Sequence, residues 1–278
     1  MNARKTILIT GSTDGIGLET ARALISLGHR VLLHGRGASK LEAVQSSLAS
    51  IGAPAGAYVA DLSRMADVEA LAAAVTADRD RLDVLINNAG VYGASDPLTA
   101  DGLDVRFAVN TLAPYLLTRR LAPLLGSDAR VVNLSSAAQS PVDPEALAGP
   151  PRLSDDAAYA QSKLALTMWS RHLAISLGEG GPVVVAVNPG SLLGTKMVRQ
   201  AYGVSGGDVA IGADVLARAA LDDAFAGASG QYFDNDSGRF APPHPDGLDA
   251  RKCRRIVDVI EEVLVDAAGI DVSTMPGV

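Results

Sequence analysis

A glycine-rich turn near the N-terminus restricts the fold more than any other feature of this sequence. Residues 10–17 read Thr-Gly-Ser-Thr-Asp-Gly-Ile-Gly and lie between an apolar run, Thr6–Thr10, and a helical pattern, Gly15–Leu27. The first glycine permits a tight exit from a strand, the second lets a ligand approach the backbone, and the third lets the helix pack closely. The turn therefore predicts a strand, a phosphate-binding loop and a helix whose free N–H groups face an anion.

Short apolar runs alternate with longer helical patterns along the rest of the chain. Runs of Val, Ile and Leu without polar alternation are typical of strands buried on both faces of a parallel sheet. The expected strands are Thr6–Thr10, Arg30–His34, Ala57–Ala60, Val84–Asn87, Arg130–Leu134, Val183–Val187 and Gln231–Phe233. The expected helices are Gly15–Leu27, Ser39–Leu48, Asp67–Ala77, Gly102–Leu124, Asp156–Leu177 and Asp208–Ala226. This order predicts an α/β fold, a doubly wound parallel sheet of about seven strands with helices on both faces.

The size of the chain is consistent with one domain. With 278 residues, 48% of them hydrophobic, it can bury a core without disulfides or metals. No linker or repeat divides the sequence, so we expect residues 1–278 to form a single domain that ends in a helix over Asp249–Ala267. Two segments rich in Pro, Gly, Ala or Asp, Ser140–Ser154 and Ser229–Asp249, are expected to be surface loops.

Charge and cysteine content exclude several classes of partner. The chain carries 24 Lys and Arg against 31 Asp and Glu, which provides no basic surface for nucleic acid. No apolar stretch reaches the roughly 20 residues of a membrane-spanning helix. One cysteine, Cys253, and four histidines without ligand spacing predict neither a disulfide nor a metal site. We expect a cytoplasmic protein that binds neither nucleic acid nor metal.

The residues after the second expected strand, Gly35-Arg36-Gly37, bear on which dinucleotide would bind. A carboxylate at this place binds the ribose 2′-hydroxyl of NAD, whereas the 2′-phosphate of NADP needs a cation. Arg36 is either that cation, with the Ser12 hydroxyl donating from the facing loop, or a solvated loop charge. We favour NADP(H) over NAD(H). Asp61, at the end of the third expected strand, either accepts from an adenine amino group or caps the next helix.

Tyr159 and Lys163 are four residues apart on an expected helix, so both side chains project from one face. The pKa of tyrosine is ordinarily about 10, and a nearby cation lowers it. Alone, this spacing is more typical of a surface helix with an extended lysine. Together with the glycine-rich turn, it suggests a phenol that exchanges a proton.

In this order, the motifs resemble the classical short-chain dehydrogenase/reductase family, and the resemblance covers nearly the whole chain. The matching residues are Thr10–Gly17, Asp61-Leu62, Asn87-Asn88-Ala89-Gly90, Asn110, Ser135-Ser136, Tyr159, Lys163 and Asn188-Pro189-Gly190. The long insertion between Ser136 and Tyr159 looks like the subgroup similar to retinol dehydrogenases and carbonyl reductases. The resemblance implies a Rossmann-type fold.

The resemblance also implies roles for these residues. Ser136, with Ser135 as the alternative, would orient the substrate oxygen, and Tyr159 would transfer the proton. Lys163 would lower the tyrosine pKa and bind the nicotinamide ribose, and Asn110 would hold a relay water. Cofactor contacts are expected from Gly11, Ser12, Thr13, Gly15, Ile16, Gly17, Arg36, Asp61, Leu62, Asn88, Ala89, Gly90, Tyr159, Lys163, Pro189, Gly190 and Thr195.

The expected function is an NADP(H)-dependent oxidoreductase. It would transfer a hydride between the nicotinamide and a carbonyl, or a primary or secondary alcohol, of a small to medium apolar substrate. The expected pocket walls, Tyr92-Gly93-Ala94, Ser140–Ser154 and Leu192–Tyr202, carry few charges, and Met197–Asp208 is expected to close as a lid. A non-catalytic NADP(H)-binding sensor on the same fold and an epimerase or dehydratase are the alternatives.

The resemblance further implies a homo-oligomer, either a dimer or a tetramer. Members of the family commonly pair through the helix that carries the tyrosine. The apolar residues expected at that contact are Leu164, Leu166, Met168, Trp169 and Leu173. The expected C-terminal helix could cover the same face.

Overall fold

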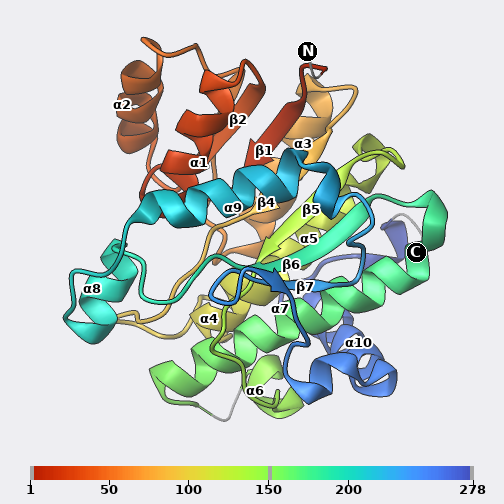
Figure 1. Ribbon diagram of the computed structural model, residues 1–278. Helices are drawn as coiled ribbons and strands as arrows, with labels where there is room; N and C mark the ends of the chain where they lie inside the picture. The colour runs from red at the N-terminus through yellow and green to blue at the C-terminus, as the bar shows by residue number, and fades with distance from the viewer. Residues whose placement is uncertain (1–2, 150–151, 276–278) are drawn as a thin grey trace.

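The computed structural model describes residues 3–149 and 152–275, which place a central sheet between two layers of helices (Figure 1). Within these residues the sheet has eight strands: β1 (Thr6–Ile9), β2 (Arg30–Gly35), β3 (Gly56–Val59), β4 (Val84–Asn87), β5 (Arg130–Leu134), β6 (Val183–Asn188), β7 (Tyr232–Asp234) and β8 (Arg239–Phe240). Their order is β3-β2-β1-β4-β5-β6-β7-β8, parallel from β3 to β7, with β8 antiparallel to β7. The predicted α/β fold is confirmed. The additional strand, β8, has two residues, too few for a recognisable pattern.

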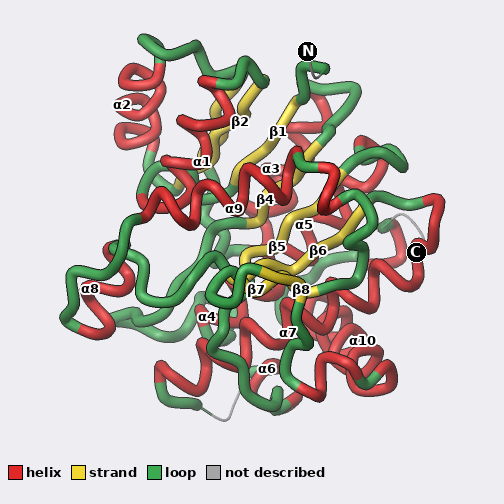
Figure 2. The backbone as a smooth tube through the Cα atoms, viewed as in Figure 1, coloured by secondary structure: helices red, strands yellow, loops and turns green. Residues whose placement is uncertain are grey.

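Helices cover both faces of the sheet, as Figure 2 shows. Their bounds are α1 (Gly15–Ser26), α2 (Ala38–Leu48), α3 (Met65–Asp78), α4 (Val105–Phe107), α5 (Ala113–Leu121), α6 (Pro144–Ala148), α7 (Asp155–Leu177), α8 (Lys196–Tyr202), α9 (Val209–Leu221) and α10 (Ala250–Asp266). Successive residues of β1 point to opposite faces. Leu8 joins the core beneath α3, α5, α7 and α10, whereas Ile7 and Ile9 join the core beneath α1, α2 and α9.

The segment Gly102–Leu124 is not the single helix that the sequence predicts. It begins as α4 after Asp104, whose carboxylate accepts from the backbone N–H of Arg106 at 2.8 Å. A π-helical turn, Ala108–Leu112, then leads into α5. A π-turn inserts an extra residue into a helix and is frequent at functional sites, and here it contains Asn110.

The C-terminal helix α10 packs along α7, the helix that carries Tyr159 (Figure 1). The side chains expected to pair two copies are at most 4% exposed in this one chain: Leu164, Leu166, Met168, Trp169 and Leu173. On α10, Glu261 accepts hydrogen bonds from the Tyr115 hydroxyl and from Arg119. The predicted contact surface is therefore wrong, because the chain covers this face with its own C-terminal helix.

The two segments predicted to be surface loops contain regular structure, and Ser229–Asp249 includes β7, β8 and a 3₁₀ turn, Pro245–Leu248. Part of Ser140–Ser154 forms α6, in which Ala146 and Leu147 are buried and pack near α10. Residues 150 and 151 of that segment lie outside the described residues. Part of the predicted lid Met197–Asp208 lies in α8. Among the described residues, none of the helices is long and apolar enough to cross a membrane.

Candidate functional site

A cavity of about 730 Å³ lies at the carboxyl ends of the parallel strands. This is the edge of an open α/β sheet where ligands bind. One end of the cavity is lined by Arg36, after β2, and the other by Tyr159 on α7. The cavity is thus lined by a guanidinium at one end and by a phenol at the other, which suits a ligand with chemically different ends.

The glycine-rich loop is held against the end of β4 by Asn88. The side-chain amide of Asn88 donates to the carbonyl oxygens of Thr10, at 2.8 Å, and Gly11, at 3.1 Å. Gly11 has φ +65°, and a Cβ there would lie 2.9 Å from the Cα of Ala89. A Cβ on Gly17 would lie 2.3 Å from the Asn88 amide nitrogen. Side chains at these two positions would push the loop out of place.

Ser12 does not face the cavity, contrary to the prediction that its hydroxyl binds a 2′-phosphate. Its side chain is fully buried and donates to the carbonyl oxygen of His34 at 3.2 Å. The same hydroxyl accepts from the backbone N–H of His34 at 2.9 Å. The contacts tie the loop to β2, so the hydroxyl is already used within the protein.

His34 completes this attachment with its ring. Its Nδ1 accepts from the backbone N–H of Gly11 at 3.1 Å, so Nε2 carries the proton toward the Ala60 carbonyl oxygen, also at 3.1 Å. Only 1% of the residue is exposed, and burial lowers the pKa of His34 to about 4. The neutral ring therefore joins the loop to the ends of β2 and β3.

Stability should consequently fall in acid through His34. Protonation is favoured in the unfolded chain below its ordinary pKa of about 6.5 and is resisted in the folded chain down to about 4. The contribution of the neutral ring to the free energy of unfolding is therefore complete above pH 6.5. It decreases between pH 6.5 and 4, by up to about 3 kcal/mol. Urea unfolding across this range should show a shallower pH dependence in His34→Gln, which keeps one donor and one acceptor. Parallel curves for the two proteins would contradict the assignment.

Cationic side chains gather at the Arg36 end of the cavity. Arg36, which follows β2, is exposed and lines the cavity, and so does Lys40, in the first turn of α2. The Lys40 ammonium donates to Asp14 at 2.6 Å, and Asp14 caps α1 by accepting from Gly15. The sequence analysis missed Lys40, because Arg36 precedes the helix and the spacing of the two residues is not a helical one.

Tyr159 and Lys163 meet at the opposite end, as their spacing predicts. The Lys163 ammonium lies 5.7 Å from the centre of the Tyr159 ring and donates to the Leu134 carbonyl oxygen at 2.7 Å. Burial lowers the pKa of Lys163 to about 8. Burial also raises the pKa of Tyr159, an effect that the Ser136 hydroxyl opposes. The expected lowering of the tyrosine pKa by Lys163 stays a prediction.

The two serines after β5 differ in their surroundings. Ser135 is buried, and its hydroxyl shares a 2.7 Å hydrogen bond with Thr167 within the helix packing. Ser136 lies at the cavity, where its hydroxyl accepts from the backbone N–H of Ala138 at 3.1 Å and contacts Tyr159. The geometry thus favours Ser136 as the serine that meets a substrate.

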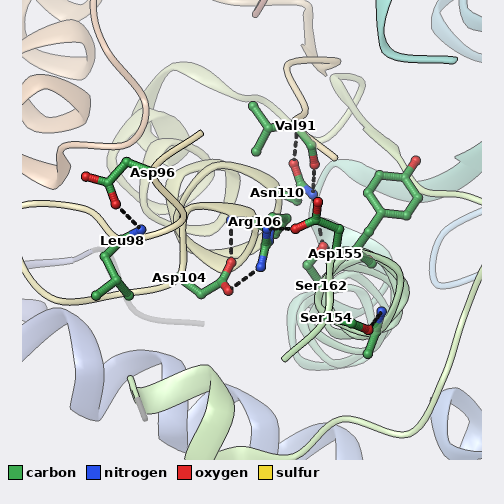
Figure 3. A network of polar contacts seen from close by, with 11 residues as sticks. Val91, Asp96, Leu98, Asp104, Arg106, Asn110, Ser154, Asp155 and Ser162 are labelled. Carbon is green, nitrogen blue, oxygen red and sulfur yellow. Dashed lines mark hydrogen bonds and ion pairs between the residues drawn. The ribbon is translucent and has the colours of Figure 1, made fainter. Parts of the chain in front are cut away.

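Asn110 connects α7, the helix that carries Tyr159, to the loop after β4 (Figure 3). Its side-chain oxygen accepts from the backbone N–H of Val91 at 2.8 Å, and its amide donates to the Val91 carbonyl at 2.9 Å. The amide also donates to the Ser162 hydroxyl at 2.9 Å. The Asn110 side chain therefore links these two segments within the core. A Cβ added at the neighbouring Gly90 would lie 3.4 Å from Asn110 Oδ1 and 3.4 Å from Lys163 Nζ, so a side chain at this position would be in close contact with both.

The remaining predicted cofactor residues border the cavity: Thr13, Gly15, Ile16, Asp61, Leu62, Ala89, Pro189, Gly190 and Thr195. Two of them also have structural contacts. Asp61 accepts from the backbone N–H and hydroxyl of Ser63 in the turn before α3, whose N-cap residue is Arg64, so the prediction that Asp61 caps this helix is wrong. Thr195 caps α8 by accepting from Val198.

The substrate end has aromatic and aliphatic walls. The ring of Tyr92 lies 5.3 Å from that of Tyr159 and 5.6 Å from that of Tyr202, measured between centres. Leu192, Met197 and other residues of the predicted wall Leu192–Tyr202 also border the cavity. By contrast, none of the described residues of the predicted wall Ser140–Ser154 borders the cavity, and α6 within this segment packs against α10, so the prediction is wrong for these residues. Tyr202 belongs to the predicted wall Leu192–Tyr202, and the structure adds its ring contact with Tyr92.

Within the described ranges 3–149 and 152–275, no three His, Cys, Asp or Glu side chains are placed so that they could hold a metal ion together.

Comparisons with known proteins agree with the geometry. A family model described as short chain dehydrogenase matches residues 5–203. Human retinol dehydrogenase 13 is 31% identical over 274 residues, which cover 91% of this chain and 82% of that protein. Mouse retinol dehydrogenase 12 is 37% identical over 204 residues, 71% of this chain and 64% of that protein. The solved RhlG/NADP active-site complex of Pseudomonas aeruginosa has a TM-score of 0.69 and 27% identity, and the match covers 85% of this chain and 96% of that one.

Proposed function

Because this chain belongs to the short-chain dehydrogenase family and is an oxidoreductase of alcohols and carbonyls, we propose that it uses NADP(H) to interconvert an apolar carbonyl compound and its alcohol. The observation that carries the proposal is the cavity that joins Arg36 to Tyr159. A dinucleotide could place its 2′-phosphate at the first residue and its nicotinamide near the second. Bound there, the cofactor would supply or accept the hydride.

The residues at the nicotinamide end would manage the proton and the substrate oxygen. Ser136 would donate to the substrate oxygen, and Tyr159 would donate a proton to it in reduction or accept one in oxidation. Lys163, whose ammonium lies beside the Tyr159 ring, would bind the ribose and favour the phenolate. Asn110 would maintain the π-turn next to them and hold the relay water.

The glycine-rich loop fits the pyrophosphate of such a cofactor. Side chains at Gly11 and Gly17 would collide with the β4 loop, and Gly15, at φ +51°, has backbone accessible from the cavity. The start of α1 also directs its first N–H groups to this region. Asp61 and Leu62 would face the adenine, and Pro189 and Gly190 the nicotinamide.

The preference for NADP(H) is supported by Arg36 and Lys40, which line the same end of the cavity. Two cations suit a phosphate that carries nearly two negative charges. The negative charge of Asp14 opposes the binding of a phosphate there. The hydrogen bond from Lys40 is the largest cause of the lowered pKa of Asp14, so the two side chains form an ion pair whose charges partly cancel. The RhlG/NADP complex is similar in fold and contains this dinucleotide.

The substrate proposal follows from the walls near Tyr159. Tyr92, Tyr202 and Met197 present apolar surface, so a small or medium apolar carbonyl fits better than a charged metabolite. The segment with α8 stands over this end as a lid. Its base is tied by hydrogen bonds from Gly194 N–H to the Gly207 carbonyl and from Gly207 N–H to the Leu192 carbonyl.

Turnover of NADPH tests the proposed function. We expect absorbance loss with an apolar ketone such as acetophenone, and a kcat/KM at least about tenfold lower with phenylglyoxylate, which adds an unpaired carboxylate to an apolar pocket. Equal values for the two ketones would contradict the substrate class. Binding of NADPH without turnover of any aldehyde, ketone or quinone would favour the sensor. Conversion without net cofactor consumption would favour an epimerase or dehydratase.

Three further expectations stay proposals. We propose that the chain forms one domain, because one sheet and its two helical layers contain its elements, and that it is cytoplasmic, because its cysteine, Cys253, is a free thiol. We also propose a homo-oligomer through a surface other than the flank of α7. Light scattering measures this, and a mass of 28.5 kDa at every micromolar concentration would contradict it.

A further inference from the structure

The turn at the end of β6, residues 188–191, contains a glycine, yet hydrogen bonds hold its conformation. It contains Gly190 at φ +120°, a conformation that L side chains rarely adopt. Within the turn, the backbone N–H of Gly190 donates a long hydrogen bond, 3.3 Å, to the side-chain oxygen of Asn188. The stronger restraints come from a different part of the chain, the tip of the hairpin formed by β7 and β8.

Asp236, at the hairpin tip, bonds to the turn with both carboxylate oxygens. One oxygen accepts from the backbone N–H of Ser191 at 2.8 Å. The other accepts from the Ser191 hydroxyl at 2.6 Å and from the Asn188 side-chain amide at 2.9 Å. Although desolvation by itself would raise the pKa of Asp236, these donors lower it. The carboxylate is therefore the form that holds the turn.

Two neighbours in the hairpin add to this attachment. Asn235 donates from its side chain to the Pro189 carbonyl oxygen at 2.9 Å, and Asp234 accepts from the Asn188 amide at 2.8 Å. The turn is thus bonded at Asn188, Pro189 and Ser191, on both sides of its glycine.

The hairpin itself is fixed to the core. Phe233 on β7, Phe240 on β8 and Phe225 form a cluster with ring centres 5.0 to 5.2 Å apart. The hydroxyl of Tyr232 on β7 donates to the backbone carbonyl of Ser136 at 3.0 Å. The same short hairpin therefore contacts both the backbone of the proposed catalytic serine and the 188–191 turn.

From these contacts we propose that Asp236 is a positioning residue, which sets the 188–191 turn as a wall for the nicotinamide half of the cofactor. The inference rests on the proposed function, in which Pro189 and Gly190 face the nicotinamide. It adds a part of the chain that lies beyond residues 5–203, the region matched by the family model. Without Asp236, the glycine-containing turn would lose three hydrogen bonds and sample other conformations.

Calorimetric titration with two ligands can separate this role from general stabilisation. NADP⁺ contacts both halves of the site, whereas adenosine 2′,5′-bisphosphate carries the adenine, the ribose and both phosphates of one half and no nicotinamide. In Asp236→Ala we expect the affinity for NADP⁺ to fall about tenfold and that for the bisphosphate to change by less than about twofold. Ser191→Ala, which keeps the backbone donor, should show a smaller loss of the same kind and serves if Asp236→Ala does not fold.

Ser237→Ala is the matched control. It removes hydrogen bonds to Asp234 inside the hairpin and leaves the contacts between Asp236 and the turn in place. We expect both affinities of this variant to match those of the unmodified protein. Equal weakening of the two ligands in Asp236→Ala, or no weakening of NADP⁺, would overturn the inference. If neither ligand binds the unmodified protein, the proposed cofactor itself is wrong.

Discussion

Replacing Tyr159 by phenylalanine is expected to reduce kcat about 10²- to 10⁴-fold, the usual contribution of general acid–base catalysis. The variant keeps the ring that packs against Tyr92 and loses the hydroxyl that exchanges the proton. Affinity for NADPH should therefore change little. Stopped-flow measurement of hydride transfer, with NADPH binding followed separately, checks both statements. A loss under about threefold, with chemistry limiting the rate, would contradict the role of Tyr159.

The pH dependence provides a second readout of the same group. In the oxidative direction the phenolate is the base, so the rate should rise with pH as Tyr159 loses its proton. Burial raises the pKa of Tyr159 in this structure, which places the rise toward alkaline pH. Tyr159→Phe should lack this rise. Tyr58→Phe, which removes a hydroxyl bonded to Asp78 away from the cavity, should keep it.

Arg36→Ala is expected to weaken NADPH binding about tenfold or more and to leave NADH binding nearly unchanged. A guanidinium binds a phosphate by charged hydrogen bonds worth about 1.5 to 3 kcal/mol, and NADH lacks the 2′-phosphate. Titration of both dinucleotides against the unmodified protein and the variant measures the change. Unaltered NADPH affinity, or equal kcat/KM for NADPH and NADH before any substitution, would identify Arg36 as a solvated loop charge.

The structure changes how the glycine before Arg36 has to be tested. A carboxylate at position 35 would repel the 2′-phosphate, which suggests Gly35→Asp as a switch toward NADH. However, a Cβ on Gly35 would lie 2.5 Å from the Cγ2 of Thr13. This glycine is required by the packing of the phosphate loop, so the double substitution of Thr13→Ser with Gly35→Asp separates charge repulsion from steric conflict.

Much of the fold and part of the site could be predicted because the relevant patterns are local. Apolar runs of strand length, helical periodicity and the turn from Gly11 to Gly17 depend on neighbouring residues. The spacing of Tyr159 and Lys163 is fixed by the geometry of one helix. The parallel order of the strands then places their carboxyl ends, and the residues that follow them, along one edge.

Only the tertiary structure determines the contacts between residues that are far apart in the chain. The direction of the Ser12 hydroxyl depends on β2, and the exposure of the α7 flank depends on whether α10 packs there. Asp236 reaches the turn at Ser191 only because β7 pairs with β6 and β8 folds back on β7. Local pattern specifies each element, but it does not determine which buried polar group satisfies another, because that choice depends on how the elements pack together.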